Sequence, residues 1–326
     1  RLVAAFASTI RRWGTSRNIF MILVFGKTGQ VARELQQLGT VTALGREEAN
    51  LSDPQACAET IRNHAPDAVI NAAAYTAVDQ AEDEEAIATV INGDAPTAMA
   101  KACAQLGIPF VHISTDYVFE GTGQDPWRSQ DQTAPQNAYG RSKLAGEIGI
   151  ADSGGTYAIL RTSWVVSAHG ANFIKTMLRL SETRHALNIV GDQIGGPTPA
   201  SDIALACLQI AEQLIQDPSK SGTYHFCGAP DVSWADFARE IFDQAGKSVA
   251  VTPIPTTDYA WLDTGTHASL LDASNFVRTL TERQGLQVGS PDEVAYQMKW
   301  LTKEQLGERA ATFRKNKYGQ YLEKLG

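Results

Sequence analysis

Two side chains four residues apart carry the clearest chemical signal in the sequence. Tyr139 and Lys143 stand in the segment Ala-Tyr-Gly-Arg-Ser-Lys, and this spacing places both on one face of a helix. A tyrosine hydroxyl has a pKa of about 10, and a neighbouring ammonium is expected to lower it. Such a tyrosine can exchange a proton with a carbonyl oxygen while a hydride reaches the carbon. Thr115 can donate a second hydrogen bond to that oxygen, so the three residues predict carbonyl reduction.

A glycine-rich segment near the start of the chain is suited to a dinucleotide. Residues 26–32 read Gly-Lys-Thr-Gly-Gln-Val-Ala, between a short apolar run and a helical pattern. A helix N-terminus offers free N–H groups and a positive dipole end to a pyrophosphate. Gly26 and Gly29 let the backbone turn tightly and approach the ligand. The order of strand, turn and helix predicts a dinucleotide-binding fold.

The end of the second predicted strand indicates which dinucleotide fits. NAD sites usually place an acid there to hold the ribose hydroxyls, but this strand ends Leu44-Gly45-Arg46, without an acid at its tip. Lys27 and Arg46 are both suited to an additional phosphate. We therefore expect NADPH as the cofactor, with NADH possible. The alternative is that these two residues are solvated surface cations.

Short apolar runs alternate with helical patterns from Met21 onwards, which predicts an α/β fold. The expected architecture is a Rossmann-type doubly wound parallel sheet with a smaller substrate-binding part and a helical C-terminal tail. In such sheets ligands bind beyond the carboxyl ends of the strands. The predicted strands are Met21–Phe25, Val41–Leu44, Asp67–Asn71, Pro109–Ser114, Tyr157–Thr162 and Thr223–Phe226. The predicted helices are Gln30–Leu38, one starting at Ser52–Pro54, Ala81–Gly107 with a break near Gly93, Ala138–Ile150, Asn172–Leu180, Asp202–Leu214 and Ser233–Ala245, with a loop at Ile194–Pro199.

Four regions follow from this pattern. Residues 21–165 are expected to form the NADP-binding core, and residues 166–257 the rest of the core and the substrate-binding part. Residues 258–326 are expected to form a helical tail. Residues 1–20 contain four arginines and no acid; we expect a non-native or unstructured leader ahead of a start at Met21, with a transit peptide as the alternative.

Composition narrows the class of partner. The chain has 326 residues, 43% of them hydrophobic, and a net charge of −8, which argues against a nucleic-acid or membrane-surface partner. No apolar run approaches the ~18 residues that a membrane span needs. Four scattered cysteines without a C-x-x-C pair are typical of reduced, buried thiols. We expect a cytoplasmic protein without a metal site.

Five segments together resemble one enzyme family, the dTDP-4-dehydrorhamnose reductases, which are extended short-chain dehydrogenases. The segments are Gly26–Gln30, Asn71–Asp79, Ser114–Phe119, Tyr139–Lys143 and Arg161–Val165. The resemblance covers about residues 21–257. It implies NADPH-dependent reduction of the C4 ketone of dTDP-4-keto-L-rhamnose to dTDP-L-rhamnose, a step of dTDP-rhamnose and surface-polysaccharide biosynthesis. It also implies a dTDP-sugar as the binding partner and a possible homodimer.

The resemblance also implies a role for each matching residue. Tyr139 would be the proton donor, Lys143 would orient the nicotinamide ribose, and Thr115 would polarise the ketone. Asp116 and Trp164 would line the sugar site with Thr115. The implied cofactor-binding residues are Gly26, Lys27, Thr28, Gly29, Gln30, Val31, Asn50, Leu51, Ala73, Ala74, Tyr75, Tyr139 and Lys143.

The resemblance changes after about Thr257. The segment 261–266, Trp-Leu-Asp-Thr-Gly-Thr, and the chain end resemble the C-terminal part of glucose-1-phosphate thymidylyltransferase, another family of the same pathway. The nucleotide loop of that family has no match here, and Asp263 lacks a partner acid, so no metal is expected. Helices are expected at Leu271–Arg283, Pro291–Trp300, Lys303–Phe313 and Tyr318–Leu325.

Two other functions stay open at this point. The chain could be a different sugar-nucleotide epimerase or dehydratase of the same superfamily, although dehydratases usually have an Asp-Glu pair after the catalytic threonine and this chain has Asp116-Tyr117. It could also be a fusion protein that binds the cofactor but is catalytically impaired, because the ending typical of the reductases is replaced.

Overall fold

The computed structural model describes two separate parts of the chain. The described residues are 20–123, 125–256, 291–297, 299, 301–313 and 317–325. The chain divides into one unit up to Pro255 and a second from Thr256 onwards. Residues 1–19 of the predicted leader and the predicted helix Leu271–Arg283 lie outside the described residues. No helix in the described part combines the length and the apolarity that a membrane span requires.

The first unit is built on a six-stranded sheet in the order β10-β5-β4-β3-β1-β2. All neighbouring strands pair in parallel, which confirms the predicted Rossmann-type fold. The chain moves outward in opposite directions from β1, to β2 on one side and to β3 on the other, and ligands bind at such a switch point. The strands are β1 (Ile22–Phe25), β2 (Val41–Leu44), β3 (Ala68–Asn71), β4 (Phe110–Thr115), β5 (Tyr157–Thr162) and β10 (Gly222–His225).

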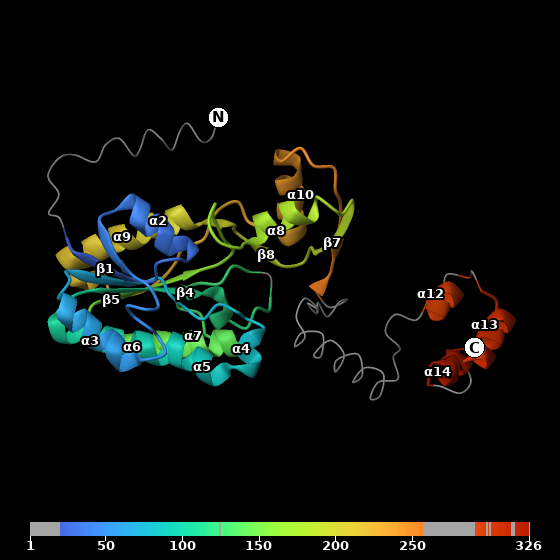
Figure 1. Ribbon diagram of the computed structural model, residues 1–326, viewed down its shortest axis with the longest axis horizontal. Coiled ribbons are helices and arrows are strands. Elements are labelled where there is room, and N and C mark those ends of the chain that lie inside the picture. The colour runs from blue at the N-terminus through green and yellow to red at the C-terminus, as the bar shows by residue number, and fades with distance from the viewer. Residues whose placement is uncertain are drawn as a thin grey trace. The chain divides into compact units, whose positions relative to one another are not determined.

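Helices cover both faces of this sheet (Figure 1). Successive strand residues point to opposite faces, so Leu23 and Phe25 of β1 join one core cluster and Ile22 and Val24 join the other. The first cluster packs against α3 (Pro54–His64) and α6 (Ala95–Leu106), and the second against α2 (Gln30–Leu38) and α9 (Ala200–Gln216). The sheet is therefore buried on both sides, as its apolar strands predicted.

The long helical segment predicted at Ala81–Gly107 is divided. It contains α4 (Gln80–Asp83), α5 (Glu85–Thr89), the π-helix η2 (Val90–Asp94) and α6. At η2, Gly93 lies so close to α7 (Ala138–Ala151) that an added Cβ would stand 3.3 Å from the Cβ of Ala145. The helix therefore changes to π geometry near Gly93 rather than breaking there, and its interruption lies at Glu84, between α4 and α5.

After β5 the chain builds a smaller part. Helices α8 (Phe173–Leu180) and α10 (Trp234–Gln244) pack around Met177 and Phe242, beside the parallel pair β7 (Ala186–Val190) and β12 (Ala250–Ile254). The remaining short elements are β6 (Val165–Val166), β8 (Ile194–Gly195), β9 (Thr198–Pro199), η4 (Pro218–Lys220) and β11 (Val232–Ser233). The prediction of a plain loop over 194–199 was wrong, because β8 and β9 pair with β11 and β6, which are distant in sequence.

The second unit contains three short helices in its described part. They are α12 (Pro291–Gln297), α13 (Lys303–Thr312) and α14 (Lys317–Leu325), close to the predicted positions. Thr302 and Gln305 form a capping box at the start of α13. Leu306 of α13 and Leu322 of α14 are buried together, so this unit has a small core of its own.

Candidate active site

The first turn of α7 brings the predicted catalytic tyrosine to the end of β4. Asn137 caps the helix by accepting a hydrogen bond of 2.7 Å from the Gly140 backbone N–H. A Cβ at Gly140 would collide with the carbonyl oxygen of Tyr117 in η3 (Asp116–Val118), so this glycine permits the close contact. The rings of Tyr117 and Tyr139 meet edge to face at 5.6 Å.

Tyr139 lies close enough to Thr115 for this threonine to affect its pKa. Thr115 Oγ1 donates to Asp116 Oδ1 at 3.1 Å and accepts from the Tyr117 backbone N–H at 3.2 Å. Burial raises the pKa of Tyr139 to about 12, and the nearby Asp116 adds to this, whereas the hydrogen bond with Thr115 lowers it. The phenol is therefore protonated at neutral pH, which is the state of a proton donor.

The position of Lys143 differs from the expectation. It lies one turn after Tyr139, but its side chain is only 1% exposed and turns inward to β4. Its Nζ lies 2.7 Å from the Ile113 carbonyl oxygen and 3.0 Å from His112 Nε2. Burial lowers the pKa of Lys143 to about 8. The expected lowering of the tyrosine pKa by this lysine was wrong for this arrangement, since the ammonium is directed elsewhere.

A buried ion pair fixes α7 against the sheet. Glu147, one turn after Lys143, accepts hydrogen bonds from Arg161 Nη2 at 2.6 Å and Nε at 3.0 Å. Ser114 of β4 donates to the same carboxylate at 2.5 Å. The Arg161 guanidinium also lies 4.9 Å from the centre of the Phe119 ring. Since α7 carries Tyr139 and Lys143, this pair determines where the two side chains stand relative to β4.

The glycine loop has the shape that a pyrophosphate requires. Gly26 has φ +111°, and an added Cβ would stand 3.2 Å from the backbone of Ala72 in the next crossover. Gly29 is the N-cap of α2, and a Cβ there would meet open space. The first backbone N–H groups of a helix have no partner within it. The open space at Gly29 and the unpartnered first N–H groups of α2 suit a dinucleotide phosphate.

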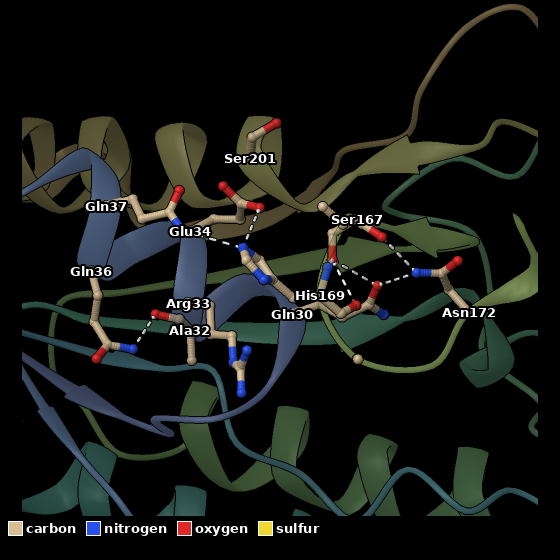
Figure 2. A network of polar contacts seen from close by, with 12 residues as sticks. Gln30, Ala32, Arg33, Glu34, Gln36, Gln37, Ser167, His169, Asn172 and Ser201 are labelled. Carbon is tan, nitrogen blue, oxygen red and sulfur yellow. Dashed lines mark hydrogen bonds and ion pairs between the residues drawn. The ribbon is translucent and has the colours of Figure 1, made fainter. Parts of the chain in front are cut away.

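The Gln30 side chain has a structural task that the sequence did not reveal (Figure 2). Its Oε1 accepts hydrogen bonds of 3.0 Å from Ser167 Oγ and from Asn172 Nδ2. In the same network His169 Nε2 lies 3.6 Å from Glu34 Oε1. These contacts join α2 to the segment between β6 and α8, so Gln30 has its backbone, rather than its side chain, available for the cofactor.

An acid lies beside the predicted phosphate-binding cation. Glu48 Oε2 accepts a hydrogen bond of 2.7 Å from the Gly45 backbone and pairs with Lys27 Nζ at 3.2 Å. The Gly45 hydrogen bond, followed by Lys27, lowers the pKa of Glu48. The expectation of no acid at the tip of β2 was therefore wrong. The loop after β2 folds back, so that Glu48, three residues after Gly45, lies beside the end of the strand. The residues of the strand itself do not indicate this. Arg46 is exposed.

The remaining predicted cofactor residues lie in two loops. After β3, Tyr75 is held by Asn92 of η2, whose Oδ1 accepts from the Tyr75 N–H at 2.8 Å. Ala73 and Ala74 in the same loop are half-buried. After β2, Asn50 is exposed and Leu51 belongs to the core. Asn92 was missed by the sequence analysis, because nothing nearby marked it as functional.

Trp164 and Asp116 are placed differently. Asp116 is exposed next to Thr115, and the surrounding protein atoms raise its pKa. Trp164 has a left-handed backbone, φ +50°, and its ring stacks on Trp234 of α10 at 3.4 Å between centres. The ring contacts described for Trp164 are with Trp234 and Phe237, so it belongs to the smaller part of the unit rather than to the tyrosine group.

Fold and site together define an oxidoreductase of the extended short-chain dehydrogenase type. A tyrosine and a lysine four residues apart on α7, a threonine at the end of β4 and a glycine loop after β1 all lie at the carboxyl ends of one parallel sheet. The family model described as RmlD substrate binding domain matches residues 20–287. The chain belongs to the dTDP-4-dehydrorhamnose reductase family. The matched region extends past the boundary that the sequence predicted near residue 257.

Relatives and solved structures agree with this assignment. The dTDP-4-dehydrorhamnose reductase of Sinorhizobium fredii is 42% identical over 248 residues, which cover 73% of this chain and 84% of that protein. The reductase of Bacillus anthracis, solved in complex with NADP, has a TM-score of 0.68 and 34% identity, and the match covers 73% of this chain and 85% of that one. A UDP-Glc/GlcNAc 4-epimerase from Campylobacter jejuni shares the fold at 20% identity, with a TM-score of 0.62 over 72% of this chain and 87% of that one.

Proposed function

We propose that this chain reduces the C4 ketone of dTDP-4-keto-L-rhamnose to dTDP-L-rhamnose with NADPH. The observation that carries the proposal is the placement of Tyr139, in the first turn of α7, beside Thr115 at the end of β4. It stands in a chain 42% identical to a reductase of that name. The NADP complex of the Bacillus anthracis relative supports the cofactor.

The residues divide the work between binding and proton transfer. When bound, NADPH supplies the hydride that reduces the ketone carbon. The loop 26–31 holds the pyrophosphate on the N-terminus of α2. Tyr139 gives its proton to the ketone oxygen, and Thr115 donates a hydrogen bond to that oxygen. The Tyr139 phenolate that remains regains a proton from solvent. Asp116 and Trp164 are the proposed contacts to the sugar.

A spectrophotometric assay tests this function. The full chain is mixed with NADPH and dTDP-4-keto-L-rhamnose, and the decrease in NADPH absorbance and the formation of dTDP-L-rhamnose are followed together. We expect one product per NADPH oxidised. An absence of turnover at saturating cofactor would favour the catalytically impaired fusion protein. Release of tightly bound NAD when the protein is denatured would favour the epimerase.

The Lys27–Glu48 pair predicts how strongly NADPH is preferred. Glu48 partly neutralises the cation proposed to hold the extra phosphate, so the preference for NADPH over NADH should be modest. Glu48→Gln frees Lys27 and should raise the NADPH-to-NADH ratio of kcat/KM by about fivefold, the size expected for an exposed ion pair. Glu47→Gln removes the same charge from the neighbouring position and is the matched control. An unchanged NADPH-to-NADH ratio of kcat/KM in Glu48→Gln would show that Lys27 does not bind the additional phosphate of NADPH.

We extend the proposal to residues 258–326. We propose that they are related to the C-terminal part of a thymidylyltransferase. We also propose that they do not provide the residues with which the reductases bind one side of the sugar nucleotide. The match to the Sinorhizobium fredii reductase covers 84% of that protein. Replacing everything after Thr257 by that relative's own ending should lower KM or raise kcat, by up to ~10²-fold where the reacting carbon is poorly held. Steady-state kinetics at saturating NADPH compare the two chains. Equal kinetics would mean that the present tail has no such defect.

The family resemblance carries two further parts of the proposal. We expect a homodimer in solution, which light scattering coupled to size-exclusion chromatography measures directly. We also expect a cytoplasmic location, which cell fractionation tests. A monomer by light scattering would remove the dimer without affecting the proposed chemistry.

A further inference from the structure

The first residue of α2 joins the cofactor loop to the substrate-binding part of the unit. Gln30 follows the N-cap Gly29, so its backbone N–H is one of the free donors at the helix start. Its side chain contacts the segment between β6 and α8 instead (Figure 2). Oε1 accepts hydrogen bonds of 3.0 Å from Ser167 Oγ and Asn172 Nδ2. Nε2 donates to the Val165 carbonyl oxygen at 3.4 Å.

The segment that Gln30 contacts is firmly attached to α8. Asn172 is the N-cap of this helix, and its Oδ1 accepts a hydrogen bond of 3.2 Å from the Lys175 backbone N–H. Its Nδ2, which bonds to Gln30, also donates to the Ser167 carbonyl oxygen at 2.8 Å. Lys175 Nζ turns back and donates to two carbonyl oxygens of the segment, at 2.6 and 3.0 Å. Whatever holds Gln30 in place therefore also holds the first turn of α8.

The first turn of α8 carries an aromatic cluster that includes Trp164. Phe173, the first residue of α8, lies 4.5 Å from Trp234 of α10 between ring centres. Trp234 in turn stacks on Trp164 at 3.4 Å. Gly195 of β8 lies so close that an added Cβ would stand 2.8 Å from the Trp164 ring. The proposed sugar contact is thus packed against the helix start to which Gln30 bonds.

Other contacts of α2 with this segment lie further along the helix. Gln30, Glu34 and Gln37 share one helix face, and His169 Nε2 lies 3.6 Å from Glu34 Oε1 and 3.2 Å from Gln37 Nε2. Gly170 has φ +64°, and a Cβ there would stand 3.3 Å from Gln30 Cγ, so glycine lets the segment close over this side chain. Of the three helix residues, Gln30 is the one at the phosphate end.

We propose that Gln30 is a positioning residue that couples the cofactor loop to Trp164. A pyrophosphate on the start of α2 fixes the backbone of Gln30, and this reduces the entropy that its side chain loses when it holds Ser167 and Asn172. The cofactor thereby favours the state in which α8 is docked on α2. Such a coupling is reciprocal, so a sugar nucleotide at Trp164 tightens cofactor binding. The sugar side of the coupling rests on the proposed reductase function, whereas the effect of the cofactor on α8 does not.

Hydrogen exchange tests the coupling without any turnover. Amide exchange of the full chain is followed by mass spectrometry in peptides that cover α8, with and without saturating NADP⁺. In the unaltered chain NADP⁺ should slow this exchange by about fivefold, the size expected for one or two hydrogen bonds. Gln30→Met keeps the length and the backbone N–H but not the side-chain hydrogen bonds, and should lose most of the slowing. Equal slowing in both proteins, or none in the unaltered chain, would overturn the proposal.

Two matched variants separate the coupling from general stability. Gln36→Met makes the same substitution on α2, where the side chain bonds to the Lys27 and Ala32 carbonyl oxygens, and should keep the effect of NADP⁺. Asn172→Ser retains a good helix cap but is too short to reach Gln30, and should lose the effect. Because both residues act through one contact, the variant with both Gln30→Met and Asn172→Ser should resemble either single one. Additive losses would contradict the proposal.

Steady-state kinetics measure the consequence for the proposed reaction. In Gln30→Met the KM for dTDP-4-keto-L-rhamnose should rise by about fivefold. The kcat value and the affinity for NADPH should change little, because Tyr139 and the backbone of the glycine loop are unaltered. A fall in kcat with an unchanged KM would overturn the role in sugar binding. If the unaltered chain does not reduce this substrate, the proposed function fails, while the hydrogen-exchange result still decides the coupling.

Discussion

Replacing Tyr139 by phenylalanine should reduce turnover by ~10²–10⁴-fold, the usual contribution of a general acid. The phenol, whose pKa burial raises to about 12, is the proposed proton donor, and phenylalanine keeps the ring while removing the proton. The ring contact with Tyr117 should survive, so the fold and NADPH binding should persist. Steady-state kinetics with saturating NADPH measure the loss, and fluorescence titration measures the cofactor affinity.

Tyr117→Phe is the matched control for this result. Tyr117 stands in edge-to-face contact with Tyr139 and is 45% exposed, and no step of the proposed mechanism needs its hydroxyl. Its variant should retain a rate close to that of the unaltered chain. Full turnover in Tyr139→Phe would contradict the mechanism. A loss of NADPH binding there would instead point to a structural defect.

Glu147→Gln should destabilise the first unit by about 3–5 kcal/mol, the range observed when one partner of a buried ion pair is removed. The two side chains are 5% and 7% exposed, so the Arg161 guanidinium would be left buried without a counter-charge. Its contacts with the Ser129 carbonyl oxygen and the Phe119 ring remain, but neither is an anion. Urea denaturation followed by circular dichroism measures the change.

Two comparisons show whether burial is the cause. Glu85→Gln breaks an exposed pair with Arg141 and should leave the urea midpoint almost unchanged. Replacing both Glu147 and Arg161 by methionine should recover much of the lost stability, because no buried charge is left unpaired. Equal effects of Glu147→Gln and Glu85→Gln would show that the pair at 147 and 161 is effectively solvated.

Local sequence patterns determined most of the fold and the segments of the site. The apolar runs at 22–25, 68–71 and 157–162 could be placed because a strand buried on both faces needs continuous apolar residues. The start of α7 could be placed from Asn137 and the helical pattern after it. Gly26 could be placed in a turn because glycine readily adopts the positive φ that tight turns need, and the structure has such a φ there. Each of these signals depends on residues within one turn or strand.

Only the tertiary structure decided which way the side chains turn and what they contact. Lys143 lies on the predicted helix face, but its amine meets His112 and Ile113, some thirty residues away in the chain. Glu48 returns to Lys27 across a loop, and β8 and β9 pair with distant segments. Helical spacing fixes the face on which a side chain starts, whereas its buried end goes where the packed neighbours offer hydrogen bonds. Those neighbours come from other strands and helices, so no local pattern in the sequence specifies them.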